Sequence, residues 1–257
     1  MSLPSLIDLF SLMALGAALG LFGGLFGIGG GIIAVPVLAL GFGMSQALAQ
    51  GTSLSMMVPI LIVGLWKYSR KHPIPLPSVI YAALLASLTT YFVAEFATDL
   101  DQDTLRTIFA LFLLILGIQM GWQKSGRFSE QSTSIVSPKW MPFVGCFGGG
   151  SMGLLGVGGG LVATPMLTYL FGQRQALAQS ISMGLVTPCA IVALFTYNAA
   201  DAVDWSVGFP LALGGLATVS RGVSLAHALP ERKMRSLFSG MLVVTALFLL
   251  IKPYVMH

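Results

Sequence analysis

Charged residues are scarce in this chain, and their scarcity decides the broad class of protein. Only 9% of the 257 residues are Asp, Glu, Lys or Arg, whereas 56% are hydrophobic and the mean hydropathy is +0.88. So few charges do not coat a water-soluble globule of this length, and we therefore expect lipid to cover most of the surface. The net charge of +4 forms no clustered basic face, so we expect no nucleic-acid partner.

Cysteines and enzyme motifs are also scarce. Cys146 and Cys189 have no closely spaced Cys or His companion, so we expect neither a metal site nor a cofactor. The chain has no HExxH motif, no paired intramembrane aspartates and no serine-nucleophile elbow, and we predict that it is not an enzyme. Its acidic residues lie in loops or at segment ends, so the carboxylate relay of many proton-coupled carriers is missing.

Apolar segments are abundant, and they form two sets of five. A helix needs roughly 20 residues to cross the hydrocarbon core, so the short segments 30–43 and 159–172 are predicted half-helices. We therefore predict an all-α integral membrane protein with broken or re-entrant half-helices. The segments lie at about 5–26, 30–43, 46–66, 76–97, 104–122, 139–157, 159–172, 175–197, 205–229 and 235–252.

The two sets are copies of one another. A shift of 129 positions, 153 minus 24, places Gly24–Pro59 on Gly153–Pro188 without a gap, and 18 of the 36 positions are identical. Such a repeat signal indicates an internal duplication. We predict a first transmembrane repeat over 1–123, a polar cytoplasmic linker over 124–138 and a second repeat over 139–257.

Loop charge gives the relative orientation of the repeats. Lys67–His72 is basic where its counterpart Thr196–Asp201 is acidic, and Asp99–Asp103 is acidic where Ala228–Arg232 is basic. Because cytoplasmic loops collect Lys and Arg, the repeats are predicted to face opposite ways, with both termini on the outer side. Each repeat then crosses five times, or three times if its first pair of segments dips in and returns. Inverted repeats are typical of secondary transporters, whose substrate lies near the midplane.

Glycine breaks mark the predicted site. Three consecutive glycines disfavour a continuous helix and expose the N-terminus of the following half-helix, whose N–H groups favour an anion. As an alternative, the glycines only let helices pack closely. The residues expected to bind substrate at the breaks are Gly29, Gly30, Gly31, Gly158, Gly159 and Gly160.

Polar residues follow each break, and a proline follows them. Their amide and hydroxyl groups suit oxyanion oxygens, and alternatively satisfy backbone groups within the membrane. Each proline is a predicted hinge or static kink. Arg221, a charge inside a span, either snorkels to the cytoplasmic interface or draws anions into a vestibule. The predicted binding residues are Gln50, Thr52, Ser53, Gln179, Ser180 and Ser182, and the prolines are Pro36, Pro59, Pro165 and Pro188.

These motifs resemble the TauE/SafE sulfite exporter family, also called the four-toluene sulfonate uptake permease family. The resemblance rests on the paired motifs Gly27–Pro36 and Gly156–Pro165, on Ala49–Ser53 and on Ala226–Phe238. It implies transport of sulfite, sulfoacetate or another organosulfonate across a bacterial inner membrane. The sequence departs from the expected pattern at Thr89–Glu95, which lacks a glycine, and the Gly51-Thr52 pair is replaced by Ser180-Ile181 in the second repeat.

We therefore predict a multi-pass secondary transporter that exports a small sulfur-containing anion by alternating access, because the membrane potential drives anions outward. Its partners are that substrate and the lipid bilayer. Uptake of organosulfur compounds, including zwitterions such as taurine, remains an alternative, as does a non-transporting membrane enzyme or assembly subunit of sulfur metabolism. A homodimer remains an alternative to a monomer.

Overall fold

The computed structural model describes residues 6–26, 29–71, 76–122, 140–173, 175–226, 239–240 and 242–250. Within these ranges every regular element is a helix, which confirms the predicted all-α fold. The helices are α1 (Leu6–Phe26), α2 (Gly31–Gly41), α3 (Gln46–Lys71), α4 (Leu76–Asp99), α5 (Gln102–Trp122), α6 (Met141–Leu155), α7 (Gly160–Phe171), α8 (Gln175–Ala199) and α9 (Trp205–Ala226), followed by helical residues at 239–240 and 242–250. The predicted linker 124–138, residues 27 and 28, and most of the 226–238 motif lie outside the described residues.

Helix lengths follow the predicted segments. Among the described helices, α1, α3, α4, α5 and α8 are long and apolar enough to cross a membrane. The two segments that are too short to cross form α2, with 11 residues, and α7, with 12 residues. A helix rises 1.5 Å per residue, so these two cover about half of the hydrocarbon core.

The outer surface is apolar and the interior holds polar side chains. On α4, large hydrophobic side chains recur every four residues along one face and are 52 to 65% exposed. A stripe of this size is unfavourable in water and suits contact with lipid tails. The members of the stripe are Ile80, Leu84, Leu88, Phe92 and Phe96.

Glycines let α1 and α9 pack at close range. A β-carbon on Gly16 would collide with the backbone of Leu211, and one on Gly20 would collide with the backbone of Gly215. From the first contact to the second, the residue number rises by four in both helices, so the two helices run parallel. At these positions the close-packing explanation of the glycines holds.

The same contact recurs between α6 and α4. A β-carbon on Gly145 would collide with the backbone of Ala82, and one on Gly149 with that of Ala86. The 129-residue shift converts each α1–α9 contact into its α6–α4 counterpart, because 16 + 129 = 145 and 211 − 129 = 82. The first helix of each half therefore packs on the fourth helix of the other half.

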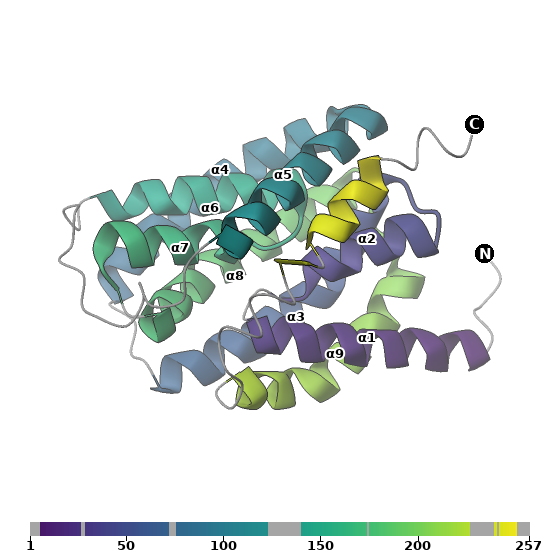
Figure 1. Cartoon of the computed structure of the whole chain (residues 1–257), viewed down its shortest axis with the longest axis horizontal. Coiled ribbons are helices and arrows are strands. Elements are labelled where there is room, and N and C mark those ends of the chain that lie inside the picture. Colours follow the sequence, from purple (N-terminus) through teal and green to yellow (C-terminus); the bar gives the residue numbers. More distant parts are fainter. Residues whose placement is uncertain are drawn as a thin grey trace.

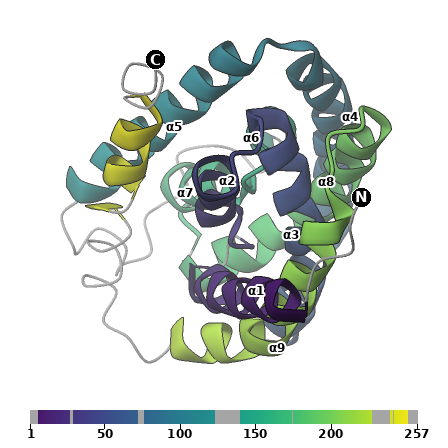
Figure 2. The same cartoon turned by 90° about the vertical axis from the view of Figure 1, so that its right-hand side faces the viewer.

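The two half-helices occupy the middle of the molecule. Figure 1 shows α7 and α2 in the same central layer, α7 towards the left and α2 towards the right. In the perpendicular view of Figure 2 they overlap near the centre, with α1 and α9 on one side and α5 on another. Seen in both views, α2 and α7 lie roughly in line.

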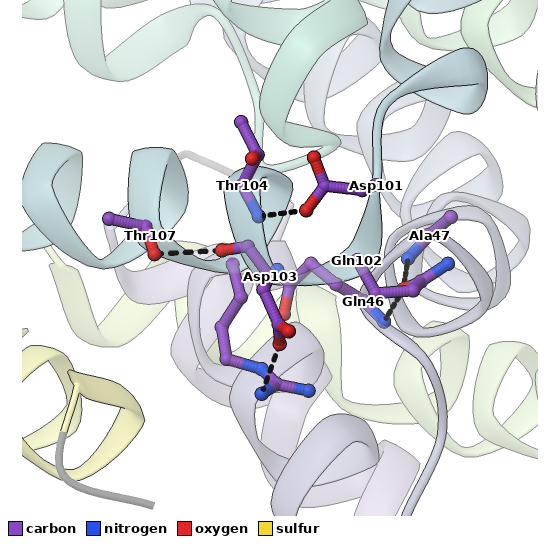
Figure 3. A network of polar contacts seen from close by, with 8 residues as sticks. Gln46, Ala47, Asp101, Gln102, Asp103, Thr104 and Thr107 are labelled. Carbon is purple, nitrogen blue, oxygen red and sulfur yellow. Dashed lines mark hydrogen bonds and ion pairs between the residues drawn. The ribbon is translucent and has the colours of Figure 1, made fainter. Parts of the chain in front are cut away.

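The start of α3 is held by α5, as Figure 3 shows. Gln102 Oε1 accepts hydrogen bonds from the backbone N–H groups of Gln46, at 2.7 Å, and Ala47, at 3.5 Å. In the same turn of α5, Asp101 Oδ2 accepts the N–H of Thr104 at 2.9 Å, and hydrogen bonds from Thr104 lower the pKa of the Asp101 carboxyl. These contacts satisfy N–H groups that a helix start otherwise leaves unpaired.

Candidate functional site

Each break places glycine backbone in the left-handed region just before a half-helix begins. Gly30 has φ 83° and ψ −5° as the N-cap of α2, and Gly158 has φ 92° two residues before α7. Neither N-cap residue, Gly30 nor Gly159, receives a side-chain cap. Backbone carbonyls within each break already accept the N–H groups of Ile33 and Ala34 in α2 and of Leu161, Val162 and Ala163 in α7. The N–H groups that remain for a ligand at these helix starts are therefore at most those of Gly31, Ile32 and Gly160.

The two breaks lie against each other. A β-carbon on Gly31, the first residue of α2, would lie 3.1 Å from the carbonyl oxygen of Gly156 in the second half. The predicted residues Gly29–Gly31 and Gly158–Gly160 are all buried. The structure therefore brings the start of one half-helix to the break of the other, at the centre of Figure 2. We call this meeting of Gly31 with Gly156 the junction.

The polar face of α3 borders this junction. Gln50 and Ser53 are both fully buried. Ser53 Oγ donates to the Gln50 carbonyl at 2.8 Å and lies 3.4 Å from the Gly156 carbonyl. A β-carbon on Gly156 would lie 3.0 Å from Gln50 Cβ. Two predicted binding residues of the first half therefore touch the break of the second half.

Thr52 points to a different contact. Its Oγ1 accepts the backbone N–H of Asp204 at 2.9 Å, in the connection between α8 and α9. The alternative interpretation, in which hydroxyl groups satisfy backbone groups, describes this residue. Thr52 therefore ties α3 to the α8–α9 connection rather than facing the glycines.

The polar residues of the second half lie on α8, which packs against α3 and α7. Ser180 and Ser182 are buried, and Gln179 is half-buried. Ser182 Oγ has no hydrogen-bond partner in the described part of the chain. It is the counterpart of Ser53, because 53 + 129 = 182. A buried hydroxyl without a partner is available to a ligand.

The remaining predicted residues lie apart from the junction or within continuous helices. Arg221 is exposed on α9 and does not join the buried cluster. The four prolines lie inside α2, α3, α7 and α8, and their role as hinges stays a prediction. They are Pro36, Pro59, Pro165 and Pro188.

Neutral groups alone surround the junction. In the ranges that the structure describes, every buried polar side chain is a Gln, Ser or Thr, or the hydroxyl of Tyr197. No group of three or more His, Cys, Asp or Glu side chains is placed to hold a metal there. The arrangement can present N–H and O–H donors to a small ligand without a neutralising charge of its own.

One buried residue was missed by sequence reasoning. Tyr197, on α8, is fully buried, and its hydroxyl donates to Gln50 Oε1 at 2.7 Å and lies 3.1 Å from the Gly153 carbonyl. A signal for it exists in the repeat, because 68 + 129 = 197 and both positions hold tyrosine.

Comparisons with known proteins agree over almost the whole chain. A family model described as the sulfite exporter TauE/SafE matches residues 12–249. A probable membrane transporter protein of Methanocaldococcus jannaschii is 26% identical over 258 residues, which cover 93% of this chain and 94% of that protein. A probable membrane transporter protein of Xylella fastidiosa is 26% identical over 91% of this chain and 90% of its own length. One of Haemophilus influenzae is also 26% identical, over 93% of this chain and 97% of its own length. No solved structure matches the chain.

Proposed function

Because the chain belongs to the TauE/SafE sulfite exporter family, a family of membrane transporters, we propose that it exports a small sulfur-containing anion across a bacterial inner membrane by alternating access. Sulfite, sulfoacetate and other organosulfonates are the proposed substrates. The protein acts as a multi-pass carrier in the lipid bilayer and not as an enzyme.

The observation that carries this proposal is the meeting of the two breaks. The start of α2 has no side-chain cap and lies beside Gly156 and the Met57 thioether, and the buried polar side chains in the described part of the chain are neutral. Helix N-termini carry partial positive charge and free N–H groups, which favour an anion. Backbone irregularity at membrane depth is tolerated where it is buried in protein or lines a cavity.

The proposed architecture is a pair of inverted repeats, 1–123 and 139–257, joined by a cytoplasmic linker. This proposal is supported by the packing of α1 on α9 and of α6 on α4, because a shift of 129 residues relates the contacts of one pair to those of the other. In Figure 1, α1 begins at the right-hand end of the molecule and α6 at the left-hand end. With this inversion the site lies between the halves, and both termini face the outer side.

Export is the proposed direction because the membrane potential drives an anion out of the cell. The potential contributes about 2.3 kcal/mol per charge for each 100 mV. Moreover, no buried Asp, Glu or His occurs in the described residues to carry a coupling proton. A uniport driven by potential is the simplest cycle that these features allow.

The test is flux in proteoliposomes with sulfite, sulfoacetate, taurine and sulfate as probes. We expect movement of sulfite or sulfoacetate that follows an imposed potential. Gly159→Leu should abolish it, because a side chain at Gly159 meets the backbone of Gly148. Gly41→Leu is the matched control, since nothing lies within 4 Å of a β-carbon there. Flux that ignores the potential and follows a pH gradient would remove the export mechanism, and binding without flux would favour an enzyme or assembly subunit.

A further inference from the structure

We infer that Tyr197 is a positioning residue that holds the Gln50 amide with its donor end towards the substrate, so that the site accepts simple oxyanions and disfavours zwitterions. This inference rests on the proposed function, because it concerns the same junction. It adds a residue outside the glycine motifs and narrows the class of substrate.

The contact itself is short and buried. Tyr197 and Gln50 are both fully buried, and the Tyr197 hydroxyl lies 2.7 Å from Gln50 Oε1 and 3.1 Å from the Gly153 carbonyl. A phenolic hydroxyl has one proton to donate, and the shorter contact to Oε1 takes it. The Gly153 carbonyl lies in the last turn of α6, so the hydroxyl is held beside the second break.

This bond decides which end of the amide is free. Because the amide is planar, the use of Oε1 by Tyr197 directs Nε2 the other way. Gln50 Nε2 is buried and has no hydrogen-bond partner among the described residues. Buried N–H groups without a partner are costly, and a ligand oxygen would satisfy them. Gln50 packs against Gly156, so these donors lie next to the break.

The free side-chain group beside the second break is therefore a donor. Gln50 Nε2 can only donate, and the Ser182 hydroxyl on α8, which also has no partner in the described chain, can donate as well as accept. An oxyanion has several acceptor oxygens and matches them. The ammonium group of a zwitterion needs an acceptor, and no buried carboxylate occurs in the parts that the structure describes. Sulfite or sulfoacetate should therefore be preferred to taurine.

The test compares the concentration dependence of flux in three full-length variants. Tyr197→Phe removes only the hydroxyl and should raise KM for sulfite or sulfoacetate about tenfold while kcat stays within about twofold, since one hydrogen bond is lost. Gln50→Glu replaces the donor end with a carboxylate oxygen and should raise KM by about a hundredfold or abolish flux. Tyr91→Phe, at a tyrosine that is 45% exposed on α4, is the matched control and should behave as the wild type.

The outcomes separate this inference from the proposed function. If the wild type moves no sulfur anion, the proposed function fails first. If the wild type moves the anion and Tyr197→Phe keeps its KM, or Gln50→Glu transports normally, the positioning role is wrong while the transporter assignment stands. If Tyr197→Phe does not fold, as judged by gel filtration and melting, Gln50→Glu decides alone. Wild-type flux of taurine equal to that of sulfoacetate would overturn the stated preference.

Discussion

Gly30→Ala perturbs the first break at one atom, and Gly43→Ala supplies its control. Both glycines adopt positive φ, 83° and 66°, so a side chain costs about 1–2 kcal/mol of backbone strain at either position. A β-carbon on Gly30 would also lie 2.8 Å from the Leu19 carbonyl oxygen, whereas nothing lies within 4 Å of one on Gly43. The difference between the two variants therefore isolates the contact of the α2 start with α1.

Relief of that contact requires α1 or the start of α2 to move, which costs about 1–3 kcal/mol by analogy with overpacked cores. At about 2–4 °C per kcal/mol, Gly30→Ala should melt roughly 2 to 12 °C below Gly43→Ala in detergent. It should also lose most anion flux, because the N–H groups of α2 are displaced from the junction. The assay is differential scanning fluorimetry followed by proteoliposome flux. Equal melting temperatures and equal flux for the two variants would refute the reasoning.

Two further predictions concern packing and topology. Gly149→Ala should destabilise the protein by about 1–3 kcal/mol, because its β-carbon meets the backbone of Ala86. Gly150→Ala is the control and should melt as the wild type does, because the nearest atom to its β-carbon is 3.9 Å away. Identical melting curves for the two variants would contradict the α4–α6 contact. The topology can be tested with single cysteines in a background without Cys146 and Cys189. A cysteine at the exposed position Asp201 should react with a membrane-impermeant maleimide from outside intact cells, whereas one at the exposed position Arg70 should react only after lysis. Reaction of both cysteines from outside would contradict the inverted orientation.

The sequence predicted the elements of this fold because each has a local signal. The short helix α2 begins at Gly31 and α7 at Gly160, where three glycines interrupt an apolar run. The opposite loop charges at Lys67–His72 and Thr196–Asp201 predicted the orientation of the halves, and orientation in turn predicted that the breaks meet. The contact of Gly31 with Gly156 agrees with that expectation.

The pairing of side chains between halves could not be predicted in the same way. Thr52 and Ser53 are neighbours of similar chemistry, yet one hydroxyl binds the backbone of Asp204 and the other lies at Gly156. Gln50 and Tyr197 are 147 positions apart, and only the packed helices bring them together. Composition and spacing do not distinguish such neighbours, because the outcome depends on which way each side chain points from its helix.

Anion-binding stoichiometry tests most directly the claim that two breaks form one site. Isothermal titration of the purified wild type with sulfite or sulfoacetate, whichever is transported, should give one anion per chain. Gly30→Ala in the first half and Gly159→Leu in the second should each abolish binding, because both breaks contribute to the same junction. Two anions per chain in the wild type, or one retained anion in both single variants, would contradict a shared site.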